Sequence, residues 1–132
     1  MKQSSAVDGV VTFSEGLPGF EAHRQFVLVA SADMEPFTVM QGVDASAPSF
    51  VAVDPRMVDR SYPTTLDRVD LARLAAHERE PLLWLAIVAA HDDGHATANL
   101  RAPVVINPGT MRGIQIIAVE SPYRTDHPLP VE

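Results

Sequence analysis

Short apolar runs alternate with turn-forming residues along most of the chain, and this pattern predicts strands. The runs are rich in β-branched residues or alternate apolar with polar positions, as is typical of strands that face a core. They recur at intervals of roughly ten residues, which indicates an all-β domain. They cover residues 7–13, 26–30, 37–41, 49–53, 82–90, 97–106 and 113–119. Short strands in this number usually curl to cover their edges, so we expect an antiparallel, barrel-like fold.

A helical spacing interrupts the strand pattern once. In residues 67–76, Leu71, Leu74 and Ala75 lie three and four positions apart, which places them on one face of a helix. Asp67 is a suitable N-cap for this segment. We therefore expect one short helix here.

The run at residues 82–90 is apolar on both faces and fits either a buried helix or a buried strand. Pro81 before it and the turn sequence Asp92-Asp93-Gly94 after it favour a strand that enters a hairpin. The expected return strand, residues 97–106, contains Pro103. Because proline donates no ladder hydrogen bond, this part of the strand is expected to be an edge or a bulge.

Two local features have a structural interpretation. Gly16 and Gly19 flank Pro18 in a predicted tight turn, and at least one of these glycines should need a positive φ. Asn99 stands in an apolar strand, where a buried polar side chain without partners costs about 1–3 kcal/mol. A bond from Asn99 to the backbone freed by Pro103 is the favoured interpretation, and a ligand contact is the alternative.

Composition narrows the possible functions. The chain has 132 residues, which fits one domain, 46% hydrophobic residues and no cysteine. Disulfides and thiol chemistry are therefore excluded, and the composition suits the cytosol. The formal charge of −7 disfavours direct nucleic-acid binding and would attract a basic partner. No apolar run is long enough to cross a membrane. Residues 1–6 are polar, do not form a secretion signal and are predicted to be disordered.

The most metal-like cluster is the segment from His91 through Asp92 and Asp93 to His95. In a turn the two imidazoles are expected to diverge, and a third ligand at a recognisable spacing is missing, so we expect a solvated hairpin tip without a metal. No nucleophile elbow or phosphate-binding loop occurs. An enzyme or small-molecule-binding barrel that uses the five histidines stays the alternative to a protein-binding module.

Several motifs resemble, in order, those of the FliW flagellar assembly factors. They run over nearly the whole chain and include FSEGLPGFE (residues 13–21), PFTVMQ (36–41), FVAVDP (50–55), ATANLRAPVVIN (96–107), RGIQ (112–115) and YRTDHPL (123–129). Two departures stand out. Gly42 occupies a position where the family usually has serine. The amino end is short, so the strand before the first glycine turn is expected to be clipped or absent.

The resemblance implies a single FliW-like β domain over residues 1–132, monomeric when free, with no catalytic residues and no cofactor. It implies a cytoplasmic protein with two protein partners, the basic RNA-binding repressor CsrA and flagellin. Binding of flagellin would release the repressor, so that translation of flagellin follows its secretion. An acidic surface suits a basic repressor.

Two sets of residues are singled out on this basis. Exposed acidic residues are the first candidates for steering the basic partner: Asp44, Asp54, Asp92 and Asp93. The residues of the family motifs are expected to form turns and core: Gly16, Leu17, Pro18, Gly19, Phe20, Asn99, Pro103 and Tyr123.

Overall fold

The computed structural model describes residues 9–117 and 121–129, so the prediction for residues 1–6 lies outside the described part of the chain. The strands are β1 (Val10–Thr12), β2 (Gln25–Val29), β3 (Phe37–Gly42), β4 (Ser49–Val53), β5 (Leu83–Ala90), β6 (Ala96–Ala98), β7 (Val104–Asn107), β8 (Arg112–Gln115) and β9 (His127–Pro128). The helical segments are the 3-10 turn η1 (Ala32–Met34) and the helices α1 (Pro55–Val58) and α2 (Arg68–Arg73).

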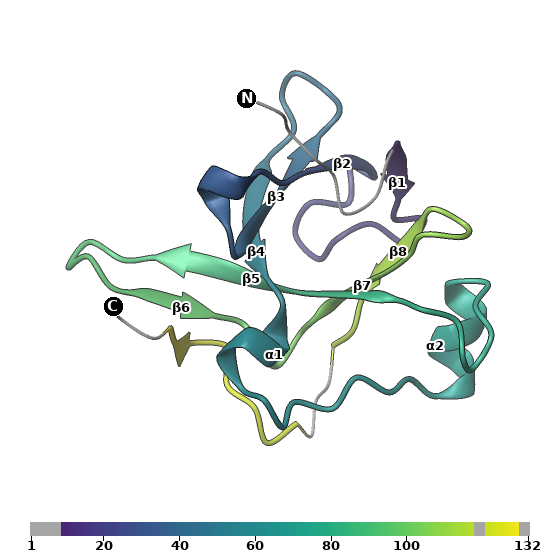
Figure 1. The fold of residues 1–132 in the computed structure, drawn as a ribbon. Coiled ribbons are helices and arrows are strands. Elements are labelled where there is room, and N and C mark those ends of the chain that lie inside the picture. The colour runs from purple at the N-terminus through teal and green to yellow at the C-terminus, as the bar shows by residue number, and fades with distance from the viewer. Residues whose placement is uncertain (1–8, 118–120, 130–132) are drawn as a thin grey trace.

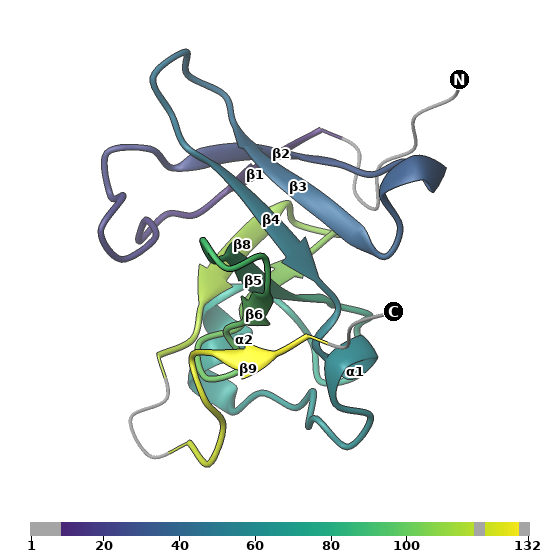
Figure 2. The same ribbon diagram turned by 90° about the vertical axis from the view of Figure 1, so that its left-hand side faces the viewer.

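The sheet closes on itself as a barrel, which confirms the predicted all-β, barrel-like fold (Figure 1). The order is β4-β3-β2-β1-β8-β7-β5, and β5 pairs back to β4. All pairings are antiparallel except β1 with β8, which meet in parallel at Thr12 and Arg112. A ring of seven strands cannot alternate direction all the way round, so one parallel neighbour is a geometric requirement. Beyond the ring, β6 and β9 extend the sheet from β5 (Figure 2).

The barrel interior holds the main core. Phe13 and Phe26 pack edge to face with ring centroids 5.6 Å apart, and both are almost fully buried. Aromatic pairs in this geometry add about 0.5–1.5 kcal/mol beyond the burial of their area. Inward-facing residues of β1 to β5 and β7 complete this core, including Leu28, Met40 and Leu85.

Two smaller clusters cover the outside of the barrel. Leu74, at the end of α2, packs on Val105 and Ile114. Tyr62, in the segment between α1 and α2, packs with Val53 on the outer face of the sheet. The long connection between β4 and β5 therefore covers the strands that it joins.

The first strand is present although the amino end is short. β1 pairs with β2 over three residues and reaches β8 through a single residue pair, so it is the narrowest part of the barrel wall. The turn that follows depends on glycine, because Gly16 has φ +73° and Gly19 has φ +87°. A Cβ at position 16 would lie 2.9 Å from the Cα of Glu21, so this position has no room for a side chain.

The predicted return strand over residues 97–106 is divided into β6 and β7, which pair with opposite halves of β5. The break follows from Asn99 and Pro103. The side-chain oxygen of Asn99 accepts the backbone N–H groups of Arg101 and Ala102 at 3.1 and 3.0 Å, and this fold-back turns the chain out of the ladder. Pro103 then has no N–H with which to resume pairing.

Helix α2 begins where it was predicted, because the side chain of Asp67 accepts the N–H of Asp70 at 2.9 Å. It ends at Arg73, three residues earlier than predicted, and Ala75 then has φ +50°. The structure also contains α1, which the sequence analysis did not predict. Asp54 caps it and Pro55 occupies its first turn, a combination that favours a helix start.

Candidate partner-binding surface

The four acidic residues predicted to steer a partner lie in three separate loops. Asp44 is in the loop between β3 and β4, and Asp92 and Asp93 form the tip of the hairpin between β5 and β6. Asp54 is at the other end of β4, where its carboxylate accepts the N–H of Arg56 at 2.9 Å. Asp54 is therefore a helix cap, whereas the three other residues lie in exposed loops.

The loops that carry these three residues border an open fork. β4 pairs with β5 only from Val51 to Val53, opposite Ala86 to Val88. The residues of β4 before Val51 pair only with β3, and the residues of β5 after Val88 pair only with β6. The β3–β4 and β5–β6 hairpins consequently diverge and project from the barrel in different directions (Figure 1).

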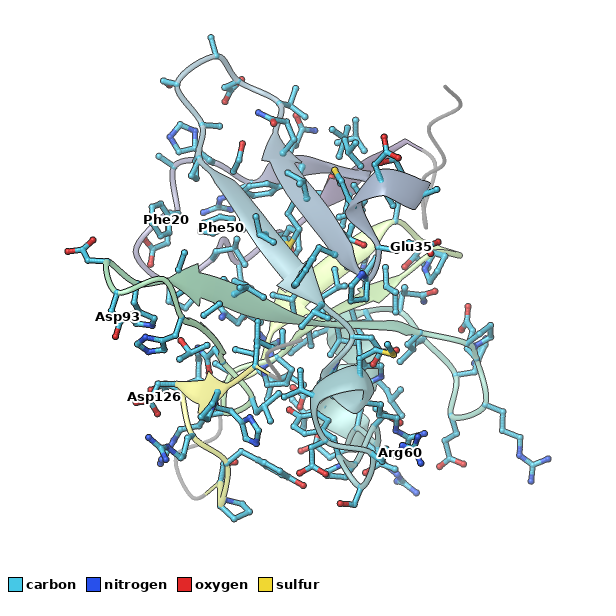
Figure 3. All side chains as sticks on the ribbon, turned by 60° about the vertical axis from the view of Figure 1, so that its left-hand side comes forward. Phe20, Glu35, Phe50, Arg60, Asp93 and Asp126 are labelled. Carbon is cyan, nitrogen blue, oxygen red and sulfur yellow. The ribbon has the colours of Figure 1, made fainter. Side chains whose placement is uncertain are left out.

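Phe20 and Phe50 lie in this fork, side by side between the two hairpins (Figure 3). Their ring centroids are 5.2 Å apart in an edge-to-face arrangement, and Phe20 is 41% exposed. Phe50 in turn lies 6.1 Å from the buried ring of Phe26. The exposed ring therefore rests on the barrel core, which makes it a preorganised apolar anchor.

The glycine turn holds Phe20 in place. Leu17, three residues earlier, is buried, and its carbonyl accepts the N–H of Phe20 at 2.8 Å. Gly16 closes the same turn by donating its N–H to the carbonyl of Phe13 at 2.8 Å. Glu21 reaches back to accept the N–H of Gly19 at 3.1 Å. The motif thus fixes the turn and presents Phe20 outward.

The rim of the fork is negatively charged. Asp44 is largely exposed and lies 3.7 Å from the imidazole of His23. At the other hairpin, the backbone N–H of His95, followed by its side chain, holds the pKa of Asp93 below its usual value. Asp93 is therefore ionised at neutral pH. We call the surface formed by Phe20 and Phe50 with the acidic residues Asp44, Asp92 and Asp93 the fork surface.

The histidines of the β5–β6 hairpin are arranged differently from the prediction. His91 and His95 do not diverge, because they face each other across the hairpin, with ring centroids 4.4 Å apart and planes within 9°. His91 lies 3.0 Å from the hydroxyl of Thr97, and His95 bonds Asp93. The nitrogen lone pairs of stacked rings lie in parallel planes and do not converge on one ion. No group of three potential metal ligands occurs within residues 9–117 and 121–129.

Most of the family-motif residues occupy turns and core. Leu17 and Pro103 are buried, and the ring centroid of Tyr123 lies 4.7 Å from that of Tyr62. Phe20 differs, since it combines a structural contact with an exposed face. Pro18 is exposed in the turn between the two glycines.

Asn107 is a fully buried polar residue whose role the sequence analysis missed. It has no exposed surface, and its amide joins the β7–β8 turn to the end of α2. It lies at the end of an apolar strand just before Pro108, a position that reads as an ordinary turn residue. Only the tertiary contact with α2 reveals its function in the fold.

Neither helix in the described part of the chain approaches the length of a bilayer-spanning segment. The fold and the fork surface define the molecule as a small closed β-barrel that presents a supported aromatic pair between two projecting hairpins. This class of architecture has been seen before. The family model described as FliW protein matches residues 2–129.

Individual relatives agree with the family match. The flagellar assembly factor FliW of Anoxybacillus flavithermus is 36% identical over 121 residues, which cover 91% of this chain and 83% of the relative. That of Caldanaerobacter subterraneus is 34% identical over 124 residues, covering 92% and 83%. A crystal structure of the flagellar assembly factor FliW superposes with a TM-score of 0.82 at 34% identity, covering 93% of this chain and 86% of that one. The chain belongs to the FliW family.

Proposed function

We propose that this protein is a cytoplasmic flagellar assembly factor that acts by binding other proteins and not by catalysis. Membership of the FliW family and the name shared by its relatives support this role. The single observation that carries the mechanism is the exposed, core-supported Phe20 ring in the fork surface. Aromatic side chains held in this way are typical anchors of protein interfaces.

The first partner is a CsrA-type RNA-binding repressor, and the second is flagellin. A repressor that binds RNA is basic, and the chain has a net charge of −7. Asp44, Asp92 and Asp93 border the anchor and place negative charge beside it, which favours the approach of a basic partner. Contact with the repressor relieves repression of flagellin messenger RNA without any contact between this chain and RNA. The free protein is a monomer, which light scattering would test.

The deciding experiment is titration calorimetry of the purified protein with the repressor of the same organism, and in parallel with flagellin. Phe20→Ala should weaken repressor binding by about 30-fold, because an aromatic hot spot contributes about 2 kcal/mol. Val69→Ala is the matched control, since Val69 is exposed on α2. Absence of a complex with either protein at tens of micromolar would refute the partners. If Phe20→Ala and Val69→Ala bind the repressor with equal affinity, the fork surface is refuted as the contact site while the partner itself is not.

The acidic rim should act mainly on the association rate. Replacing Asp44, Asp92 and Asp93 by asparagine should slow association several-fold at low salt and flatten its salt dependence, with a small effect on dissociation. Asp33→Asn, in η1 between β2 and β3, removes one charge outside the fork surface and is the control for the effect of net charge per charge removed. An unchanged association rate in the triple variant would show that the rim does not steer the partner.

A hydrolytic or small-molecule-binding barrel is the rival function, and the placement of the histidines does not favour it. His23 lies in the turn after β1, His77 follows α2, and His127 is in β9. His91 and His95 point along an exposed hairpin instead of into a pocket.

A further inference from the structure

A second hollowed surface lies at the opposite end of β5 from the fork. It consists of two adjoining hollows that share Thr65 and Trp84 in their linings. The first has a volume of about 390 Å³, and the second about 350 Å³. We call them together the Trp84 groove.

The two halves of the Trp84 groove differ in chemistry. The first hollow has an aliphatic floor and two carboxylates, and its lining includes Leu66, Leu71, Leu82, Glu78 and Glu80. The second is aromatic and rich in proline, with Tyr62, Tyr123, Pro63, Pro103 and Ile116 among its lining residues. One end of the groove is therefore acidic, and the other is mainly apolar, with Arg101 among its lining residues.

The apolar end is preformed. The Tyr62 hydroxyl donates to the carbonyl of Leu100 at 2.7 Å, which fixes the ring between its neighbours. The ring centroid of Tyr62 lies 6.4 Å from that of Trp84 and 4.7 Å from that of Tyr123. An occupant of this hollow would meet side chains that are already ordered, which lowers the entropic cost of binding.

The acidic end carries two carboxylates without an ion-pair partner in the described part of the chain. Within residues 9–117 and 121–129, no ion pair involves Glu78 or Glu80, although Glu80 accepts the backbone N–H of His77 at 2.9 Å. Arg73, at the end of α2, pairs instead with Glu15 and Asp70, at 2.8 and 2.7 Å. The two carboxylates are therefore available to a cation from another molecule.

We infer that the Trp84 groove binds an extended segment of a partner protein that carries an arginine or lysine followed by proline or aliphatic residues. The stem of the basic side chain would pack on the leucines, and its charged head would meet Glu78 and Glu80. The Trp84 ring, between the two hollows, can add a cation–π contact. Proline-rich extended segments fit aromatic-lined grooves because they lose little entropy on binding. This surface shares no residue with the fork surface, so it goes beyond the function proposed above.

The chain contains one tryptophan, so the fluorescence of Trp84 reports directly on this groove. The probes are acetylated peptides in which one arginine precedes a Pro-Pro-Leu segment by two, three or four alanines. At least one of them should cause a saturable change in Trp84 emission. Peptides with glutamate in place of arginine should bind at least about threefold more weakly, the loss expected from exposed ion pairs.

The variant Glu78→Gln/Glu80→Gln should bind the arginine and glutamate peptides with nearly equal affinity, because it lacks the two carboxylates that favour arginine. Asp33→Asn/Glu35→Gln removes two charges outside the groove and should behave as wild type. No saturable response to any arginine peptide up to about 1 mM, or an undiminished preference for arginine in the Glu78→Gln/Glu80→Gln variant, would overturn the inference. Phe20→Ala should leave peptide binding unchanged, so failure of this proposal and failure of the fork surface are distinguishable.

Discussion

Asn107 is predicted to be the most sensitive polar residue of the fold. Its side-chain N–H donates to the carbonyl of Leu74 at 3.1 Å and to that of Ala75 at 3.4 Å, and its oxygen accepts the N–H of Gly109 at 2.9 Å. These bonds fasten the end of α2 to the turn after β7. Because Leu71 of α2 lines the Trp84 groove, Asn107 also supports a wall of that groove. The perturbation is Asn107→Ala.

The magnitude follows from the individual contacts. The two bonds at 3.1 and 2.9 Å contribute about 1 kcal/mol each, and the bond at 3.4 Å adds little. The carbonyl of Leu74 keeps a second donor, since the Thr110 hydroxyl lies 2.8 Å away. Removal of a fully buried amide also leaves a small void. We therefore expect Asn107→Ala to lower the free energy of unfolding by about 2–3 kcal/mol.

Urea denaturation followed by circular dichroism would measure this loss. With a slope of about 1–3 kcal/mol per molar, the midpoint should fall by roughly 0.7–3 M while the slope stays constant. Asn107→Asp keeps the acceptor for Gly109 but directs a carboxylate at two carbonyls, so it should destabilise the protein more than alanine does. A loss below about 0.5 kcal/mol for Asn107→Ala, or an aspartate variant more stable than the alanine variant, would refute this reasoning.

Two further predictions concern the glycine turn and a buried tyrosine. Gly16→Val should destabilise the protein by about 1–3 kcal/mol, because φ at Gly16 is +73° and a Cβ there would lie 2.9 Å from Glu21. Gly19→Val should cost less, because φ at Gly19 is +87° but no atom lies within 4 Å of a Cβ there. Equal shifts of the thermal midpoint in the two variants would contradict this difference. Burial, and secondarily the nearby Tyr123, raises the pKa of Tyr62 from 10 to about 12. Because the fold favours the neutral phenol, Tyr62 contributes up to about 3 kcal/mol to the free energy of unfolding. This contribution is complete below the pKa of the tyrosine in the unfolded chain and is lost as the pH rises through its pKa in the folded protein. In urea titrations between pH 10 and about 12, the Tyr62→Phe variant should lose less stability with rising pH than the wild type does. An equal dependence of stability on pH in the two proteins would contradict the assignment.

Local signals in the sequence predicted the features that depend on neighbouring residues. The cap by Asp67 and the positive φ of Gly16 and Gly19 follow from rules about capping and backbone freedom, and the structure confirms them. The start of α1 could also have been found, because Asp54-Pro55 is a cap followed by a favoured first-turn residue. The sequence analysis considered this dipeptide only as part of a family motif, and Asp54 only as an exposed acidic residue.

Features that depend on closure of the barrel could not be predicted from local sequence signals. The parallel contact of Thr12 with Arg112 follows from the number of strands in the ring, which no local pattern encodes. Whether His91 and His95 meet depends on the register of a hairpin whose loop length admits more than one turn. The sequence analysis placed Phe20 among turn and core residues because it belongs to a family motif, whereas its ring is 41% exposed between the two diverging hairpins (Figure 3).

The two proposed surfaces are joined by a single strand. Trp84 lies near the start of β5, and the hairpin with Asp92 and Asp93 follows its end at Ala90. Six residues of extended chain span about 20 Å, so a small ligand on one surface does not reach the other. β5 is also the strand that pairs with β4, β6 and β7, which holds both surfaces in a fixed relation. Any antagonism between ligands of the two surfaces must therefore arise from the bulk of a partner or from a change in β5 itself. Because coupling between binding sites is reciprocal, the peptide affinity reported by Trp84, measured with and without the fork partner, gives the sign and size of that coupling.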